Sequence, residues 1–298
     1  MPASFARRLL PCLLLAAVSG AAQTQSVSFF GNVVDKKGNA VAQAAAADLP
    51  SLVIAKAPAA NLKVSPAAET PLFLGVLMDM SNSDGATSFL AQSGNAALHL
   101  MNQVVRRGKD AAFLGGFSLK IDYDSGLTDD RQQWLKTAQQ MKVGGPTALY
   151  DAIAQVCTKE LRPEAGRGSV RRVLIIVSDG GDNQSKTNQD AALAAALENG
   201  VTIFVVDPRQ EMGDPEWARL KKFADDTGGR GINLAEADQV APAFATIQQD
   251  INAQQWITAE IPAAGGGHLL EVRSQGKGTL RWRLPKKVMP ASSPAPSN

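Results

Sequence analysis

The sequence predicts an α/β protein with a doubly wound, mostly parallel sheet flanked by helices, plus a small β-rich module. Between residues 71 and 254, apolar runs alternate with amphipathic stretches of helical period, which is the pattern of βαβ units. On either side, residues 23–70 and 255–284 read as short strands separated by turns. Each flank is too short to bury a core alone. We therefore expect the flanks to pair into one module, with the α/β domain inserted between them.

The elements follow from hydrophobic spacing along the chain. Apolar runs predict strands at residues 72–78, 111–117, 173–177 and 201–206, and short strands are expected at 119–123 and 231–234. Apolar residues at helical spacing predict helices at 90–105, 131–141, 148–161, 191–197, 216–225 and 237–253. The flanks are expected to form strands at 27–35, 51–56, 61–65, 256–261, 268–273 and 279–284. The tail, residues 285–298, is rich in Pro and Ser and is expected to be disordered.

Residues 1–22 are expected to be a secretory signal peptide. Arg7 and Arg8 precede an apolar run at residues 9–18, and small residues follow it. Cys12 lies inside the run after Pro11, where a lipid-anchor signal would place a small residue before the cysteine. The pattern therefore indicates export, to the periplasm or outside the cell, without a lipid anchor.

Composition excludes several classes of function. The 30 Lys and Arg nearly balance the 28 Asp and Glu, so bulk charge does not predict nucleic acid or an anionic membrane as a partner. No stretch approaches the ~20 apolar residues of a membrane span. With 2 Cys and 2 His, thiolate zinc sites and disulfide scaffolds are excluded. Cys157 lies in an apolar helical pattern and is expected to be an inert buried thiol.

Three predicted loops carry hydroxyl and carboxylate side chains. Asp79, Ser81 and Ser83 end the first buried strand, Thr147 lies in a glycine-rich loop, and Asp179 ends a later buried strand. Ligands of open parallel sheets bind at the carboxyl ends of strands, at the switch point of strand order. Oxygen ligands of this kind suit a hard cation such as Mg²⁺. Each residue alone has a structural explanation as a helix cap or turn former, but together they predict a metal site.

These residues resemble the metal-ion-dependent adhesion site of the von Willebrand factor A family. That pattern is Asp-x-Ser-x-Ser, then a Thr in a glycine-rich loop, then an Asp ending a later strand, and all five positions are filled here. The resemblance covers residues 71–254, and the stretches 147–153 and 171–180 match closely. Residues 34–39 resemble a segment of secreted bacterial relatives, many of them acidobacterial. Met80 and Asn82 depart from the commoner Thr and Gly, but neither is a ligand position.

The resemblance implies binding rather than catalysis. Ser81, Ser83 and Thr147 would ligate Mg²⁺ or Mn²⁺ directly, while Asp79 and Asp179 would act largely through water. A Glu or Asp side chain of a partner protein would complete the coordination of the metal ion. The family also suggests that the last helix, residues 237–253, shifts between weak and strong binding states.

Two other functions compete with this one. An enzyme would need a base, and the candidates are His99, His268 and, for a Mg²⁺-dependent hydrolase, Asp182. Both histidines are expected to be structural or exposed. A scaffold would leave the metal site unused and bind partners through the β-module. No phosphate-binding glycine fingerprint is present.

Overall fold

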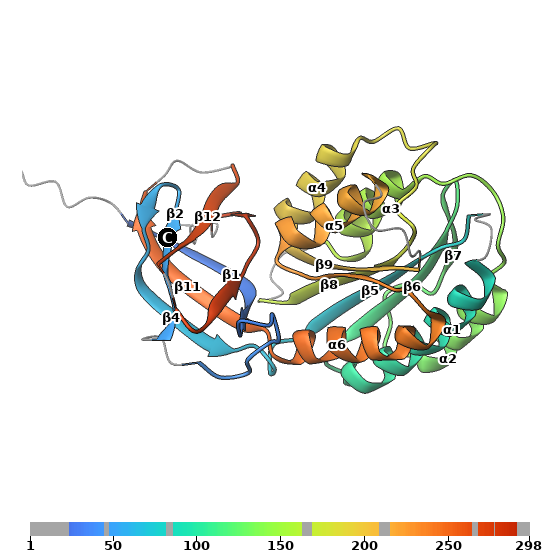
Figure 1. The fold of residues 1–298 in the computed structure, drawn as a ribbon, viewed down its shortest axis with the longest axis horizontal. Helices are drawn as coiled ribbons and strands as arrows, with labels where there is room; N and C mark the ends of the chain where they lie inside the picture. The colour runs from blue at the N-terminus through green and yellow to red at the C-terminus, as the bar shows by residue number, and fades with distance from the viewer. Residues whose placement is uncertain are drawn as a thin grey trace, which may run out of the picture.

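A computed structural model describes residues 24–44, 48–81, 86–162, 169–208, 215–263, 268–276 and 278–290. The expected signal peptide, at residues 1–22, lies outside these ranges. The described chain forms a large α/β domain beside a smaller β-module (Figure 1). Within the described residues, no helix is both long and apolar enough to cross a membrane.

The α/β domain is built on a six-stranded sheet with the order β10-β9-β8-β5-β6-β7. All neighbouring strands are parallel except β6 and β7, which are antiparallel. The strands are β5 (Leu72–Asp79), β6 (Ala111–Phe117), β7 (Ile121–Asp124), β8 (Arg171–Val177), β9 (Val201–Asp207) and β10 (Gly231–Asn233). The chain starts in the middle at β5, runs outward to β7, and returns to β8 on the other side of β5. The predicted doubly wound sheet is therefore confirmed, with its switch point between β5 and β8.

Helices cover both faces of the sheet. On one face lie α1 (Ala86–Val104), α2 (Arg131–Gln140) and α6 (Val240–Asn252). On the other lie α3 (Leu149–Gln155), α4 (Gln189–Glu198) and α5 (Pro215–Thr227). Short turns extend two of these helices, a π-helical turn at Val156–Glu160 and a 3₁₀ turn at Ala237–Gln239.

The sequence of strand β5 is apolar without a break because both of its faces are buried under helices. Leu74 and Val76 pack into the core under α1 and α6, whereas Phe73 and Leu77 pack into the core under α3 and α5. Successive side chains of a strand point to opposite faces, so a strand with helices on both faces must be apolar at every position. Cys157 is buried in the second of these cores, and burial raises the pKa of its thiol to about 12. The expectation of an inert thiol is confirmed.

The two flanks form one β-module, as predicted. One sheet has the order β13-β1-β11-β4 and the other β14-β12-β2-β3. The strands are β1 (Thr24–Val34), β2 (Ser51–Ile54), β3 (Ala57–Pro58), β4 (Ala60–Pro66), β11 (Gln255–Pro262), β12 (Leu270–Gln275), β13 (Arg281–Arg283) and β14 (Lys287–Val288). Strand β1 pairs with β11 from Thr24↔Pro262 to Gly31↔Gln255. Apolar side chains from both sheets, including those of Val27, Ile54 and Ile257, form a single core.

The predicted disorder of the tail is wrong for its first residues. Lys287–Val288 forms β14, which pairs with β12. Val288 is buried in the module core, and the backbone N–H of Lys286 donates to the carbonyl of Asp226 (2.8 Å). The stabilisation gained by burying the Val288 side chain on an existing sheet edge outweighs the tendency of a Pro- and Ser-rich segment to be disordered. Residues 291–298 lie outside the described ranges.

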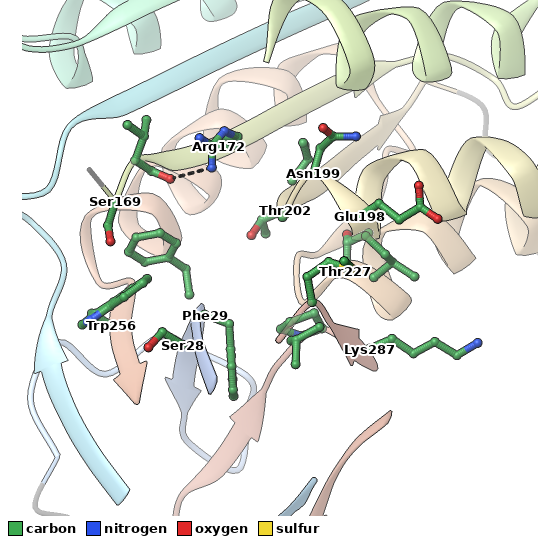
Figure 2. A pocket seen from close by; sticks show the side chains of 18 residues that line it. Ser28, Phe29, Ser169, Arg172, Glu198, Asn199, Thr202, Thr227, Trp256 and Lys287 are labelled. Atoms are coloured by element: carbon green, nitrogen blue, oxygen red, sulfur yellow. Dashed lines mark hydrogen bonds between the residues drawn. The ribbon is translucent and has the colours of Figure 1, made fainter. Parts of the chain in front are cut away.

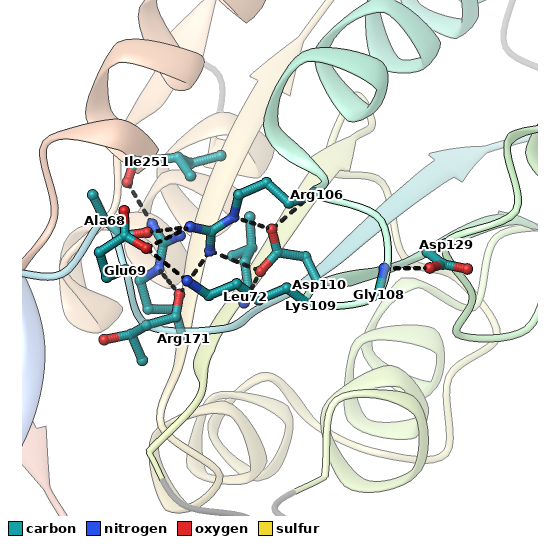
Figure 3. A network of polar contacts seen from close by, with 11 residues as sticks. Ala68, Glu69, Leu72, Arg106, Gly108, Lys109, Asp110, Asp129, Arg171 and Ile251 are labelled. Atoms are coloured by element: carbon teal, nitrogen blue, oxygen red, sulfur yellow. Dashed lines mark hydrogen bonds and ion pairs between the residues drawn. The ribbon is translucent and has the colours of Figure 1, made fainter.

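A polar network surrounds the point where the chain enters the α/β domain (Figure 3). Asp110 accepts hydrogen bonds from the side chain of Arg106 (2.6 Å from Nε) and from the backbone N–H of Leu72 (2.8 Å). Arg106 and Arg171 donate to the carbonyl of Thr70, and Arg171 also donates to the carbonyl of Ile251 (3.0 Å). The start of β5 and the end of α6 are thus held together.

The α/β domain and the β-module enclose a cavity of about 470 Å³ (Figure 2). Arg172 and Thr202, near the amino ends of β8 and β9, line one side, while Phe29 and Trp256 of the module line the other. This is the opposite edge of the sheet from the predicted metal site, and the cavity is lined by none of the predicted metal-site residues that the structure describes.

Candidate metal centre

Asp79 and Asp179 lie beside each other at the switch point. Asp79 is the last residue of β5, and Asp179 follows β8 by two residues. The parallel pairing of Met78 with Val177 places the two strand ends side by side. Burial is the main cause that raises the pKa of Asp79, and the nearby charge of Asp179 adds to the rise. The sheet topology therefore places the ends of β5 and β8 next to each other, as predicted.

Hydrogen bonds fix the orientation of the Asp79 carboxyl group. Its Oδ1 accepts from the backbone N–H of Ser81 (2.9 Å), and its Oδ2 accepts from the hydroxyl of Ser178 (2.7 Å). Burial raises the pKa of Asp79 above its ordinary value of 3.8, and hydrogen bonds from Ser178 and Ser81 act against this rise. The folded chain therefore holds a carboxylate in surroundings that favour its neutral form unless a positive charge is near.

Ser178 is a member of this cluster that the sequence analysis did not single out. It is buried, and its hydroxyl both donates to Asp79 and accepts from the backbone N–H of Gly180 (3.0 Å). Gly180 has φ +84°, and a Cβ there would lie 2.8 Å from the carbonyl oxygen of Glu216. The position of Ser178 at the end of a buried strand, directly before Asp179, is the signal that could have identified it.

A small cavity lies between the strand ends and the start of α1. Its volume is about 20 Å³, and Asp79, Ser81, Ser178 and Asp179 line its polar side. A single water-sized species needs roughly 10–15 Å³. Carboxylate and hydroxyl oxygens around such a space are the donors that a hard cation prefers. The described residues therefore fit a divalent cation.

Thr147 is held in a neighbouring loop. It is buried, and its backbone N–H donates to Oδ1 of Asn183 (3.1 Å), while its carbonyl accepts from the N–H groups of Asn183 and Gln184 (3.0 Å each). The N–H of Gly144 donates to the carbonyl of Met80 (2.7 Å), so this loop is also tied to the segment after Asp79. Thr147 is not among the described residues that line the small cavity. Ser83 lies in the range 82–85, outside the described residues.

The residues considered as catalytic bases either have a structural role or lie away from the small cavity. Oδ1 of Asp182 accepts from the backbone N–H of Leu149 (2.9 Å) and from the hydroxyl of Ser185 (2.7 Å), so Asp182 caps α3. His99 lies within α1 and His268 precedes β12, and neither lines the small cavity. Among the described residues there is no group of three or more His, Cys, Asp or Glu that could hold a metal. A cation here would depend on hydroxyl ligands.

A family model described as the von Willebrand factor type A domain matches residues 74–249, more than half of the chain. The chain belongs to this family. The match covers the sheet from β5 to β10 and most of α6, including Asp79, Ser81, Thr147 and Asp179. The resemblance inferred from the sequence motif is confirmed at the level of family and fold.

Two solved structures with TM-scores above 0.5 have a similar fold. Two structures of proximal thread matrix protein 1 from the mussel byssus each align with a TM-score of 0.52 at 12–13% identity, over 68% of this chain. One of them is described with a zinc-occupied MIDAS motif. A von Willebrand factor type A protein from Catenulispora acidiphila aligns over 92% of this chain and 76% of its own, at 12% identity and a TM-score of 0.49. The chain spans about half the length of the mussel proteins (50–51%). No curated protein sequence matches it significantly.

Proposed function

We propose that this chain is an exported binding protein whose von Willebrand factor type A domain holds Mg²⁺ or Mn²⁺ and binds an acidic residue of a partner protein. The observation that carries the proposal is the partly buried Asp79 carboxyl group beside Asp179, facing a cavity of about 20 Å³ that Ser81 and Ser178 also line. Asp79, Ser81, Ser83, Thr147 and Asp179 would hold the cation. The zinc-occupied MIDAS motif of a structural neighbour supports a cation at this position of the fold.

The residues explain why such a site would bind rather than catalyse. Ser81, Ser83 and Thr147 are neutral ligands, and a cation that keeps most of its charge attracts an anionic oxygen from outside. Asp79 is oriented by Ser81 and Ser178, so it can accept hydrogen bonds from metal-bound water without rearrangement. Oδ1 of Asp182, the candidate base, accepts hydrogen bonds from the N–H of Leu149 and the hydroxyl of Ser185, which supports a structural role for this carboxylate.

Export rests on the sequence of residues 1–22, with a basic start and a short apolar run. The same pattern places the protein in the periplasm or outside the cell. Partners there would be envelope or extracellular proteins that present a Glu or Asp side chain.

The proposal is tested in two steps with the full chain. Isothermal titration with MgCl₂, MnCl₂ and ZnCl₂ should show one site in the wild type and none in Asp79→Ala. Asp190→Ala, which removes an exposed carboxylate from α4, should bind the metal like the wild type. Retention of an envelope protein by the wild type with Mg²⁺, but not with EDTA or by Thr147→Ala, would support metal-bridged binding. Retention that is unaffected by both EDTA and Thr147→Ala would contradict it and favour the scaffold.

A further inference from the structure

An apolar groove continues from the proposed metal edge between α1 and α2. Its volume is about 460 Å³. Leu90 lines both this groove and the small cavity at Asp79, so the two spaces are neighbours. Met78 and Met80, on either side of Asp79 in the chain, contribute to its floor. The groove and the proposed metal site therefore form one continuous surface.

The groove is suited to an uncharged apolar side chain. None of the described residues that line it is charged, and its polar groups come from Asn95 and Gln139. Met78, Met80 and Met141 supply flexible thioether side chains that adapt to an inserted group. A charged group placed here would lose its hydration without gaining a partner of opposite charge.

Gly94 keeps the groove open. It lies in the interior of α1, where glycine is unfavourable relative to alanine. A Cβ at this position would meet only the Cε of Met78, at 3.9 Å, which is ordinary van der Waals contact. Packing within the folded chain does not require glycine here. Its missing side chain instead leaves space on the wall that α1 presents to the groove.

Exposed apolar side chains surround the same corner of the molecule. Within the described residues, four large apolar side chains are exposed, and three of them lie here: Leu135 (42% exposed) and Val143 (36%) line the groove, and Leu119 (55%) lies in the neighbouring loop. Leu119 follows Ser118, whose carbonyl accepts from the N–H of Ala148 next to Thr147 (2.8 Å). Exposed apolar groups clustered beside a polar site are typical of protein-binding surfaces.

We propose that the α1–α2 groove binds an apolar side chain, Leu, Met or Phe, that lies a few residues from the partner's acidic residue. This inference rests on the proposed function, because the acid at the cation positions the segment. The cation selects a carboxylate, and the uncharged groove selects an apolar neighbour. Together they define the partner as an exposed protein segment that combines both side chains at a fixed spacing.

The test is a selection of peptides from a phage-displayed library of random twelve-residue sequences on the immobilised full chain in Mg²⁺, with elution by EDTA. Selected peptides should share an acidic residue and an apolar residue at constant spacing. Replacing that apolar residue by Ala in a synthetic peptide should weaken binding roughly tenfold or more. The methyl NMR signals of Met78 and Met80 should shift on addition of the parent peptide and not of the Ala peptide.

Two variants separate the groove from the metal site. Gly94→Leu fills the groove, and Leu135→Ser changes an exposed side chain at its rim without altering the core. Both variants should reduce peptide affinity about tenfold, while their affinity for Mg²⁺ stays unchanged. Ala245→Leu is the control, because it places the same leucine side chain on the exposed side of α6, beside a different cavity on the same face of the sheet.

Each outcome is informative. EDTA-eluted peptides with an acid but no apolar preference would overturn the groove and leave the proposed function standing. Failure to obtain any EDTA-eluted peptide would overturn both. A dimer in light scattering that Leu135→Ser abolishes would assign the groove to a second copy of this chain and overturn the inference.

Discussion

At the residue scale, Asp79 shows how the proposed metal site would be built at the expense of stability. Its carboxyl group is enclosed at the end of β5, next to a second carboxylate. Both the burial and Asp179 raise its pKa, and the hydrogen bonds from Ser178 and Ser81 offset only part of this. Folding therefore works against the ionised form of Asp79, and a cation at the proposed site would compensate for this.

Asp79→Asn should make the metal-free protein more stable at neutral pH and abolish its response to metal. Because the pKa of Asp79 is raised in the folded state, the free energy of unfolding of the metal-free wild type falls as pH rises through that pKa. Asp79→Asn has no carboxyl group at this position, so its free energy of unfolding does not fall for this reason. At Mg²⁺ one hundred times its Kd, the wild type should gain about 2.7 kcal/mol and the variant nothing. Urea denaturation with and without Mg²⁺ measures both effects. A metal-free variant that is less stable than the wild type would contradict this account.

At the element scale, the network around Asp110 joins the linker at residues 67–71 to β5 and to the loop after α1 (Figure 3). Burial pushes the pKa of Asp110 upward, but hydrogen bonds from Arg106 and from the N–H of Leu72 outweigh it, so the pKa lies below 3.8. The ionised carboxylate thus stabilises the entry of the chain into the α/β domain.

Asp110→Ala should lower the free energy of unfolding at pH 7 by roughly 2–4 kcal/mol, since buried N–H groups lose their acceptor. In the wild type, the contribution of Asp110 is present above pH ~4 and is lost as pH falls through the depressed folded-state pKa. The difference in stability between the wild type and the variant should therefore shrink below pH 4. Chemical denaturation at pH 7, 5 and 3 measures it, and a difference independent of pH would contradict this role. Asp129→Ala, which removes one exposed hydrogen bond to Gly108, is the matched control.

At the scale of the whole molecule, a buried carboxylate clamps the end of α6 to the β-module. Asp250 is 1% exposed and forms ion pairs with Arg230 (2.8 Å) and with Arg283 of β13 (2.7 Å). Its backbone carbonyl accepts from the side chain of Asn32 in β1 (2.8 Å). The helix that ends the α/β domain is thus held to the two flanks that enclose it, so movement of α6 would strain the module.

Asp250→Ala should destabilise the protein by roughly 3–5 kcal/mol, because two largely buried guanidinium groups lose their partner. Limited proteolysis should then cleave the β-module before the α/β domain. In a double-mutant cycle, Arg283→Met should be less harmful on the Asp250→Ala background than alone. Additive effects would show that the ion pair does not hold the two parts together.

The sequence by itself determined the fold class and most of the elements, because these depend on local periodicity. The family followed from the resemblance of the motif at Asp79, Thr147 and Asp179 to a known adhesion site. Apolar runs such as that of β5 are continuous when helices cover both faces of a strand. A strand that ends in Asp79, and another that ends next to Asp179, must place both residues at one edge of a parallel sheet. The roles of Asp79, Ser81, Ser83, Thr147 and Asp179 at a metal site stay predictions.

The tertiary structure decided what depends on residues far apart in the chain. The hydrogen bond between Ser178 and Asp79 joins residues 99 positions apart in the sequence, and the one between Asn32 and Asp250 joins residues 218 positions apart. Such contacts leave no periodic signal in the sequence, and neither does the groove, whose walls come from α1, α2 and the end of β5. The tail at Lys287–Val288 is ordered for the same reason, since its strand exists only on the edge that β12 provides. Local spacing specifies which side chains are available, and long-range packing specifies which of them meet.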